Sequence, residues 1–134
     1  MIGALPEKIL EAVLETIPIE FSVIDGNDAV LAWNKHETRI FKRPEAVVGR
    51  NVADCHPKGS LEKVEAILSE MKAGTRETAR FWIDLPVGDG GQNQKVMIEY
   101  YALRTPTGEY LGCMECSQNI SAIQALSGEK RLLD

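Results

Sequence analysis

The sequence predicts an α+β domain with one five-stranded antiparallel sheet. Two strand-like segments are followed by helical segments and then by three further strand-like segments, an order typical of α+β folds with a single antiparallel sheet. The chain has 134 residues, of which 44% are hydrophobic and 26% are charged, which suits one soluble domain with a substantial core. We expect a flanking segment over residues 1–18, a core over 19–119 and a tail over 120–134.

The first predicted element is a helix with a single apolar stripe. Pro6 suits the first turn of a helix, and Pro18 ends it, because the residue before a proline is pushed out of the helical region. A helix of about a dozen residues is marginal alone, so we expect the stripe to pack on the outer face of its own sheet or on a second chain. The stripe recurs at three- and four-residue intervals and consists of Ile9, Leu10, Val13, Leu14 and Ile17.

A hairpin and short helices are predicted next. Residues 20–25 and 29–33 carry strand-forming side chains on either side of the Gly26-Asn27-Asp28 turn cluster, which favours a hairpin. Asn34 and Glu37 have the spacing of a capping box, so we expect a short helix over about residues 35–41. A second helical turn is expected over 43–49, and a loop over 50–59.

One longer helix and three strands complete the predicted core. Ser60 is a candidate N-cap, and Gly74 can adopt the left-handed conformation that ends a helix. Strands are expected over about residues 76–85, 95–104 and 109–118, joined by a flexible loop over 86–94 and a tight turn over 105–108. The apolar face of the helix is formed by Leu61, Val64, Ile67, Leu68 and Met71.

Charge and composition exclude several classes of partner. The net charge is -5 and the basic residues are scattered, which argues against a nucleic-acid groove and against binding to an anionic membrane surface. No apolar run approaches the roughly 20 residues that span a bilayer, and the N-terminus lacks the pattern of a signal peptide. Three cysteines are too few for a disulfide scaffold. We therefore expect a cytoplasmic protein with no nucleic-acid and no membrane partner.

Catalytic motifs are absent from the sequence. There is no nucleophile elbow, no phosphate-binding loop and no H-E-x-x-H motif. Gly88, Gly90 and Gly91 fall in the predicted hairpin loop, where no helix N-terminus follows to bind phosphate. We expect that the chain is not an enzyme.

Several local patterns together resemble PAS sensory domains. An apolar strand ending at Asp25 leads through a turn and a second strand to Asn34, and an acidic residue then precedes an apolar pair and Gly-Arg in residues 45–50. The segment 108–121 starts a long strand at a glycine and closes it on Gln-Asn-Ile-Ser, which is similar to the end of a PAS domain. This resemblance implies a PAS fold, with short helices and one longer helix over one face of the sheet and the last strand in its middle.

A narrower resemblance is carried by three further segments, residues 41–44, 54–57 and 128–133. They are similar to a bacterial PAS subfamily at the C-terminus of hemerythrin-associated proteins of unknown function. The sequence leaves open whether the chain is a whole protein or an excised domain.

The resemblance places a ligand pocket between the helices and the sheet, where concave sites commonly form. Strand alternation puts Gly112, Met114 and Cys116 on one face, and Cys113 and Glu115 on the other. We expect the first set to face the pocket and to be less exposed than the second. Met114 stands where light-sensing relatives carry a flavin-contacting glutamine, and their reactive-cysteine motif is absent, so flavin photochemistry is not expected. The candidate pocket residues are Cys55, His56, Leu68, Met71, Met114 and Cys116.

Metal and haem binding rest on few residues. Cys113 and Cys116 spell C-x-x-C, but on a strand their sulfurs point to opposite faces, unlike the paired cysteines of metal knuckles. Cys55 and His56 lie just before the long helix and are of the side-chain types that bind haem iron, zinc or copper. Haem-binding PAS domains often supply their histidine from the long helix, where this sequence has none. The cofactor stays unknown, and a small molecule or none is favoured over haem or a metal.

The predicted function is that of a PAS sensory or regulatory domain. It would sense a small ligand or redox state, or mediate dimerisation, and relay this to a partner or an output domain, which the chain itself does not contain. One alternative is a haem- or metal-binding redox or gas sensor that uses Cys55 and His56. Another is a ligand-free protein–protein interaction module. Because PAS relatives often dimerise through an N-terminal helix, we expect a homodimer in which residues 7–17 form much of the contact.

Overall fold

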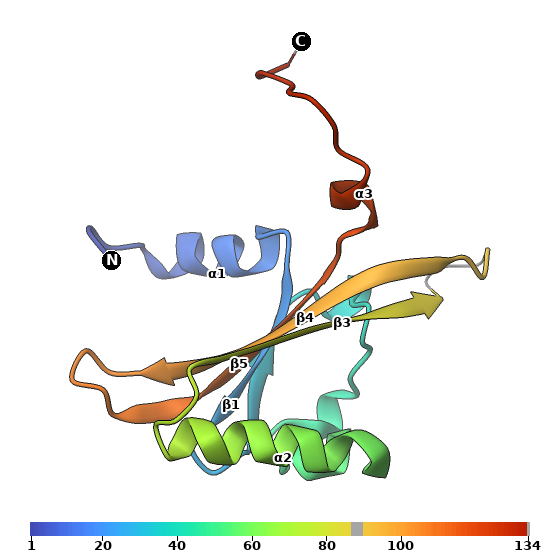
Figure 1. Ribbon diagram of the computed structural model, residues 1–134. Coiled ribbons are helices and arrows are strands. Elements are labelled where there is room, and N and C mark those ends of the chain that lie inside the picture. Colours follow the sequence, from blue (N-terminus) through green and yellow to red (C-terminus); the bar gives the residue numbers. More distant parts are fainter. Residues whose placement is uncertain (87–89, 134) are drawn as a thin grey trace.

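The five-stranded antiparallel sheet that the sequence predicts forms the centre of the computed structural model, which describes residues 1–86 and 90–133 (Figure 1). The strand order is β2-β1-β5-β4-β3, so the last strand lies in the middle of the sheet, as expected. Part of the predicted flexible loop, residues 87–89, lies outside the described residues. The strands are β1 (Glu20–Asp25), β2 (Val30–Trp33), β3 (Thr78–Pro86), β4 (Asn93–Arg104) and β5 (Tyr110–Asn119).

The two faces of the sheet are covered differently. Helix α2 (Lys58–Lys72) and three short 3-10 helices, η1 (His36–Thr38), η2 (Glu45–Val47) and η3 (Val52–Cys55), belong to the layer on one face, which we call the inner face. Helix α1 (Glu7–Thr16) lies on the other side, the outer face (Figure 1). The core forms between α2 and the inner face, and its buried members are Ile24, Val30, Val52, Val64, Leu68, Met71, Val96, Ile98, Tyr100 and Cys113.

Strand register decides which side chains share the inner face. Glu115 of β5 lies opposite Ser22 of β1 and Tyr100 of β4. Two residues along, Cys113 lies opposite Ile24. Because side chains directly opposite one another in a sheet point to the same face, these five residues form one continuous inner surface.

The expected helix over 35–41 is reduced to η1, because Asn34 does not cap it. The Asn34 side chain is buried, and its oxygen accepts a hydrogen bond from the backbone N–H of Phe21 at 2.7 Å. Its amide nitrogen donates to the carbonyl oxygens of Leu14 (2.7 Å) and Ile19 (3.0 Å). Asn34 therefore ties the end of α1 to the start of the sheet, and the amide is not free to cap a helix.

Helix α2 starts earlier than Ser60. Pro57 occupies the N-cap position with no side-chain cap, and the Ser60 hydroxyl donates to the Pro57 carbonyl at 3.1 Å. At the other end Gly74 has a φ of +78°, which confirms the expected left-handed stop.

The C-terminal segment leaves the sheet after β5. A short helix, α3 (Ser121–Gln124), follows β5, and the remaining residues extend away from the body of the domain (Figure 1). None of the helices in the described part of the chain has the length and apolar character needed to cross a bilayer.

Candidate functional site

A cleft of about 760 Å³, here called the outer cleft, opens between the inner face and the segments that cover it. One wall comes from residues 40–43, and a second from residues 55–57 and the first turns of α2. The floor is formed by β3 and β4, which contribute the apolar side chains Phe81, Ile83, Leu85 and Ile98. A concave, mostly apolar space with a few polar groups is the usual form of a small-molecule site.

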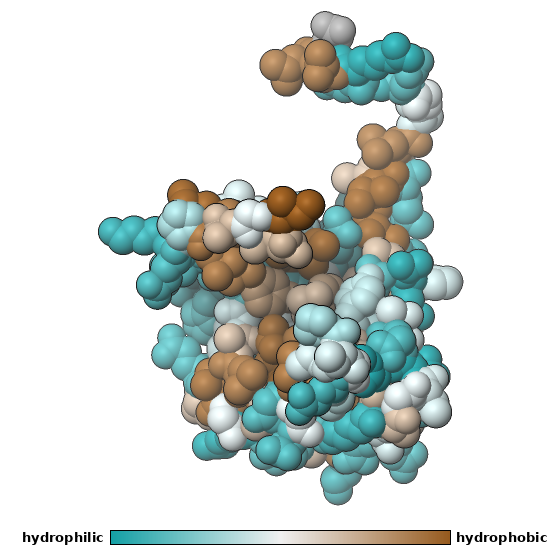
Figure 2. Space-filling model, turned by 90° about the vertical axis from the view of Figure 1, so that its left-hand side faces the viewer, coloured by the Kyte–Doolittle hydropathy of each residue, from teal (hydrophilic) through white to brown (hydrophobic). Residues whose placement is uncertain are grey.

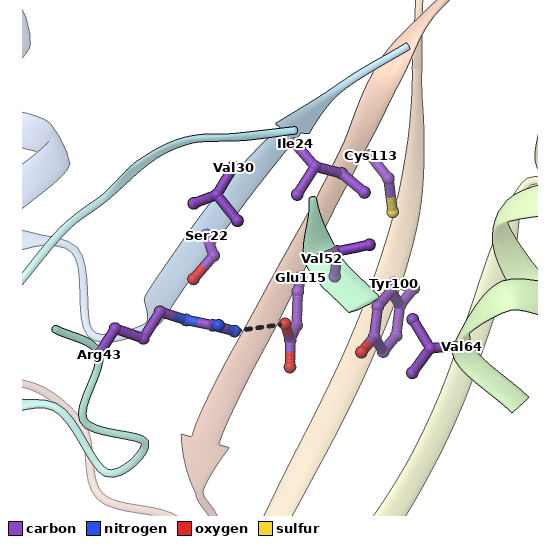
Figure 3. A pocket seen from close by; sticks show the side chains of 9 residues that line it. All are labelled: Ser22, Ile24, Val30, Arg43, Val52, Val64, Tyr100, Cys113 and Glu115. Atoms are coloured by element: carbon purple, nitrogen blue, oxygen red, sulfur yellow. Dashed lines mark hydrogen bonds and ion pairs between the residues drawn. The ribbon is translucent and has the colours of Figure 1, made fainter. Parts of the chain in front are cut away.

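A smaller inner recess lies next to the outer cleft. Its volume is about 10 Å³, which is room for roughly one water molecule. Both cavities are lined by the same four residues, Arg43, Val64, Tyr100 and Glu115, which therefore form the junction between them. The recess itself is mostly apolar, with Ile24, Val30, Val52 and Cys113 in its wall (Figure 3).

Charged and polar groups concentrate at this junction. Arg43 Nη2 donates to Glu115 Oε2 at 3.0 Å, and the two side chains are only 11% and 19% exposed. In Figure 3 the Glu115 carboxylate lies between the Arg43 guanidinium and the Tyr100 ring. Burial, and secondly the nearby Glu115 carboxylate, raise the pKa of Tyr100, so its hydroxyl keeps its proton and acts as a hydrogen-bond donor throughout the physiological range.

A second buried ion pair holds one wall of the outer cleft in place. Arg39 Nη2 lies 3.2 Å from Glu20 Oε2, and both side chains are almost fully buried. Glu20 also accepts the backbone N–H of Ile40 at 2.9 Å, and Arg39 Nε donates to the Phe41 carbonyl at 3.0 Å. Burial raises the pKa of Glu20, while Arg39 acts in the opposite direction. The pair fixes residues 39–41 against β1, and so positions Arg43 just beyond them.

Cys55 and His56 line the outer cleft. Cys55 is partly buried at the end of η3. His56 Nδ1 lies 3.0 Å from the carbonyl oxygen of Val52, and since a carbonyl can only accept, Nδ1 carries the proton. This bond orients the imidazole from within its own loop.

Leu68 and Met71 belong to the packed core. They are 1% and 0% exposed and line neither cavity among those described. Val64, one turn earlier on the same face of α2, is the residue that reaches the junction.

The expected orientation of β5 is wrong. The alternation is present, but Cys113 and Glu115 face the pocket, while Met114 lies opposite Val23 and Cys116 opposite Phe21 on the outer side. Alternation divides a strand into two sets without saying which set faces the helices, and both sets here mix sulfur-containing and polar side chains. The expected order of exposure is also wrong for the cysteines, because Cys113 is 1% exposed and Cys116 is 8% exposed.

Four of the candidate pocket residues are therefore not brought together. Cys55 and His56 lie at the outer cleft, whereas Met114 and Cys116 lie on the other face of the sheet. Within the described ranges, no group of three or more His, Cys, Asp or Glu side chains is placed to hold a metal ion.

Sequence reasoning did not select the polar residues at the junction. Arg43, Tyr100 and Glu115 were absent from the predicted pocket set. The available signal was Glu115 itself, since a charged residue in the middle of the central strand of a sheet is buried only when it is paired.

Comparison with known proteins gives one family and several related folds. The family described as PAS domain matches residues 10–121. The structure is similar to that of a C-terminal domain from Streptococcus mutans, with 26% identity, a TM-score of 0.83 and coverage of 95% of this chain and 94% of that one. No curated protein sequence matches the chain.

Two further structures share the fold at lower identity. The PAS domain of Bordetella pertussis BvgS has 18% identity and a TM-score of 0.61, with coverage of 84% of this chain and 85% of that one. The VqmA–ligand–DNA complex from Vibrio cholerae has 14% identity and a TM-score of 0.59, and the match covers 96% of this chain and 62% of that one.

Proposed function

Because the chain belongs to the PAS domain family, whose members are commonly sensory domains of signalling proteins, we propose that it senses a small molecule bound in the outer cleft. Binding would be relayed to a partner protein or to an output domain. The observation that carries this proposal is the cleft itself, about 760 Å³ in volume, with an apolar floor and a polar junction at its inner end. The narrower likeness to hemerythrin-associated proteins stays a prediction, as does the expectation of no nucleic-acid partner.

The direct test is to look for a bound molecule. Native mass spectrometry of the purified protein, repeated after denaturation, should show a small-molecule adduct that is lost on unfolding. A matched variant, Ser60→Trp, places a large side chain at the cleft wall and should lose the adduct. Exchange of Ser69→Trp, at an exposed position of the same helix outside the cleft lining, should keep it. Absence of any adduct, together with no binding of small molecules to the cleft, would contradict the proposal.

A second proposal, homodimerisation through α1, is favoured by the exposure of its apolar stripe. Ile9, Leu10, Val13 and Leu14 are between 39% and 51% exposed, and no residue of α1 is buried. Figure 2 shows hydrophobic surface on α1 and in the hollow below it. An exposed apolar surface of this kind commonly marks a protein interaction site, and the equivalent helix of a second copy is a self-complementary occupant.

Sedimentation velocity at tens of micromolar tests the dimer. The intact chain should sediment as a dimer, and the double variant Leu10→Glu/Val13→Glu as a monomer, because two charges would be buried in the contact. Glu11→Gln, on the polar side of the same helix, should leave the dimer unchanged. A monomeric intact chain would show that α1 only covers its own sheet.

A further inference from the structure

The arginines at and beside the cleft are paired with carboxylates of the protein. Arg43 is paired with Glu115 at 3.0 Å, and Arg39 with Glu20 at 3.2 Å. Lys42 also lines the outer cleft, but its ammonium group donates to the carbonyl of Glu37 at 2.7 Å at an exposed position. The junction therefore presents one partly buried cation that is already neutralised by one partly buried carboxylate.

One buried donor at the junction has no partner. Arg43 Nε is shielded from solvent and makes no hydrogen bond to any described residue. Leaving a buried donor unpaired lowers stability, and Arg43 lines both cavities. A hydrogen-bond acceptor supplied by a bound molecule would remove this cost.

The charge of that acceptor follows from Glu115. An anionic group close to Arg43 would also lie close to the Glu115 carboxylate, and like charges in a buried setting repel strongly. A neutral carbonyl or amide oxygen meets the same donor without this repulsion. An N–H beside it could donate to the Glu115 carboxylate.

We propose that the outer cleft, if it is the sensory site proposed above, selects uncharged molecules that have an apolar body and a hydrogen-bonding head such as an amide. The head lies at the junction, beside the Arg43–Glu115 pair. The body lies over the apolar floor formed by Ile83 and Ile98. The inner recess, at about 10 Å³, is too small to admit the body.

The test uses two probes with one skeleton, phenylacetamide and phenylacetate, measured by calorimetry and by NMR titration at neutral pH. The wild-type protein should bind the amide at least about tenfold more tightly than the carboxylate, a difference of about 1.4 kcal/mol. Glu115→Gln should reverse this preference, because Arg43 then carries an unpaired charge. Glu109→Gln, an exposed substitution in the turn before β5, should behave as the wild type.

A second variant keeps the test decisive if Glu115→Gln does not fold. Arg43→Gln removes the cation, so it should weaken amide binding and gain no affinity for the carboxylate. Equal or tighter binding of phenylacetate to the wild type, or an unchanged preference in Glu115→Gln, would overturn the inference.

The inference and the proposed function can fail separately. A co-purified molecule together with no binding of either probe up to millimolar concentration would overturn the inference and leave the sensory proposal standing. If neither a co-purified molecule nor binding of either probe were found, the inference and the proposed function would both be contradicted.

Discussion

The inner and outer faces of the sheet differ in how exposed their charged side chains are. On the inner face, Glu115 and Arg43 are paired beside a cavity, and both side chains are less than 20% exposed. On the outer face the ion pair between Arg80 and Glu99 lies across β3 and β4, and although Glu99 is only 14% exposed, the Arg80 side chain is 62% exposed. Buried charges need a partner because desolvation is costly, whereas exposed pairs contribute little to stability.

This difference separates two kinds of surface on one sheet. The inner face has paired, largely shielded charges beside a cleft with an apolar floor, which suits recognition of a small molecule. Beside the outer face lies helix α1, whose side chains Ile9, Leu10, Val13 and Leu14 stay 39–51% exposed, which suits association with another protein surface. Substitutions that alter one face and leave the other unchanged test whether the two faces have these separate roles.

The largest expected effect comes from Gly112 of β5, which pairs with Asp25 of β1. Its φ is +154°, and an added Cβ would lie 2.1 Å from the carbonyl oxygen of Ile24. Because backbone must move, Gly112→Ala should lower the free energy of unfolding by about 3–5 kcal/mol and disturb both faces. Thermal denaturation should show a loss of about 10 °C or more.

Gly108→Ala is the matched control for this prediction. Gly108 also has a positive φ, +92°, but nothing lies within 4 Å of an added Cβ. Gly108→Ala should lower the free energy of unfolding by only about 1 kcal/mol. Equal losses of unfolding free energy for the two substitutions would contradict the close contact between Gly112 and the Ile24 carbonyl.

Cysteine reactivity should sharpen the comparison of the faces. Cys113 is buried on the inner face with a pKa raised by burial to about 12, and Cys116 is on the outer face with a pKa raised to about 11. At pH 8 the thiolate fraction of Cys113 is therefore about tenfold smaller. Partly exposed Cys55 should be alkylated first, Cys116 next and Cys113 last. Mass spectrometry of time points gives the order. Faster labelling of Cys113 than of Cys116 would contradict the placement of Cys113 on the inner face and of Cys116 on the outer face.

The smallest expected effects come from two adjacent tyrosines. Tyr101 on the outer face donates to Glu99 at 2.6 Å, so Tyr101→Phe should cost about 0.5–1.5 kcal/mol of stability without changing the affinity of a cleft probe. Tyr100→Phe removes a hydroxyl from the junction and should weaken binding of phenylacetamide by about 3- to 10-fold. Chemical denaturation and calorimetry measure the two quantities. Weaker binding of phenylacetamide to Tyr101→Phe would contradict the claim that the outer face does not take part in ligand binding.

Sequence patterns predicted the elements better than the site. The strands, the α2 face around Leu68 and the stop at Gly74 follow from local periodicity and turn chemistry, which act within a few residues. The capping role of Asn34 could not be excluded in this way, because its partners Leu14 and Phe21 are distant in sequence.

The candidate site depends on contacts over still longer separations. Arg43 and Glu115 are 72 residues apart, and no local pattern indicates that they meet. The orientation of β5 is likewise set by packing against α2 rather than by its own alternation. The position of Cys55 and His56 beside a pocket followed from the resemblance to PAS domains and not from spacing.

The most direct test of the division between faces is a methyl NMR titration with phenylacetamide, read at residues of both faces. Val64, Ile83 and Ile98 line the outer cleft, whereas Met97 and Met114 belong to the outer face. The methyl signals of the first three should shift in proportion to the bound fraction, and those of the two methionines should not. Shifts at the methionines with none at the cleft residues would contradict the assignment of ligand binding to the inner face.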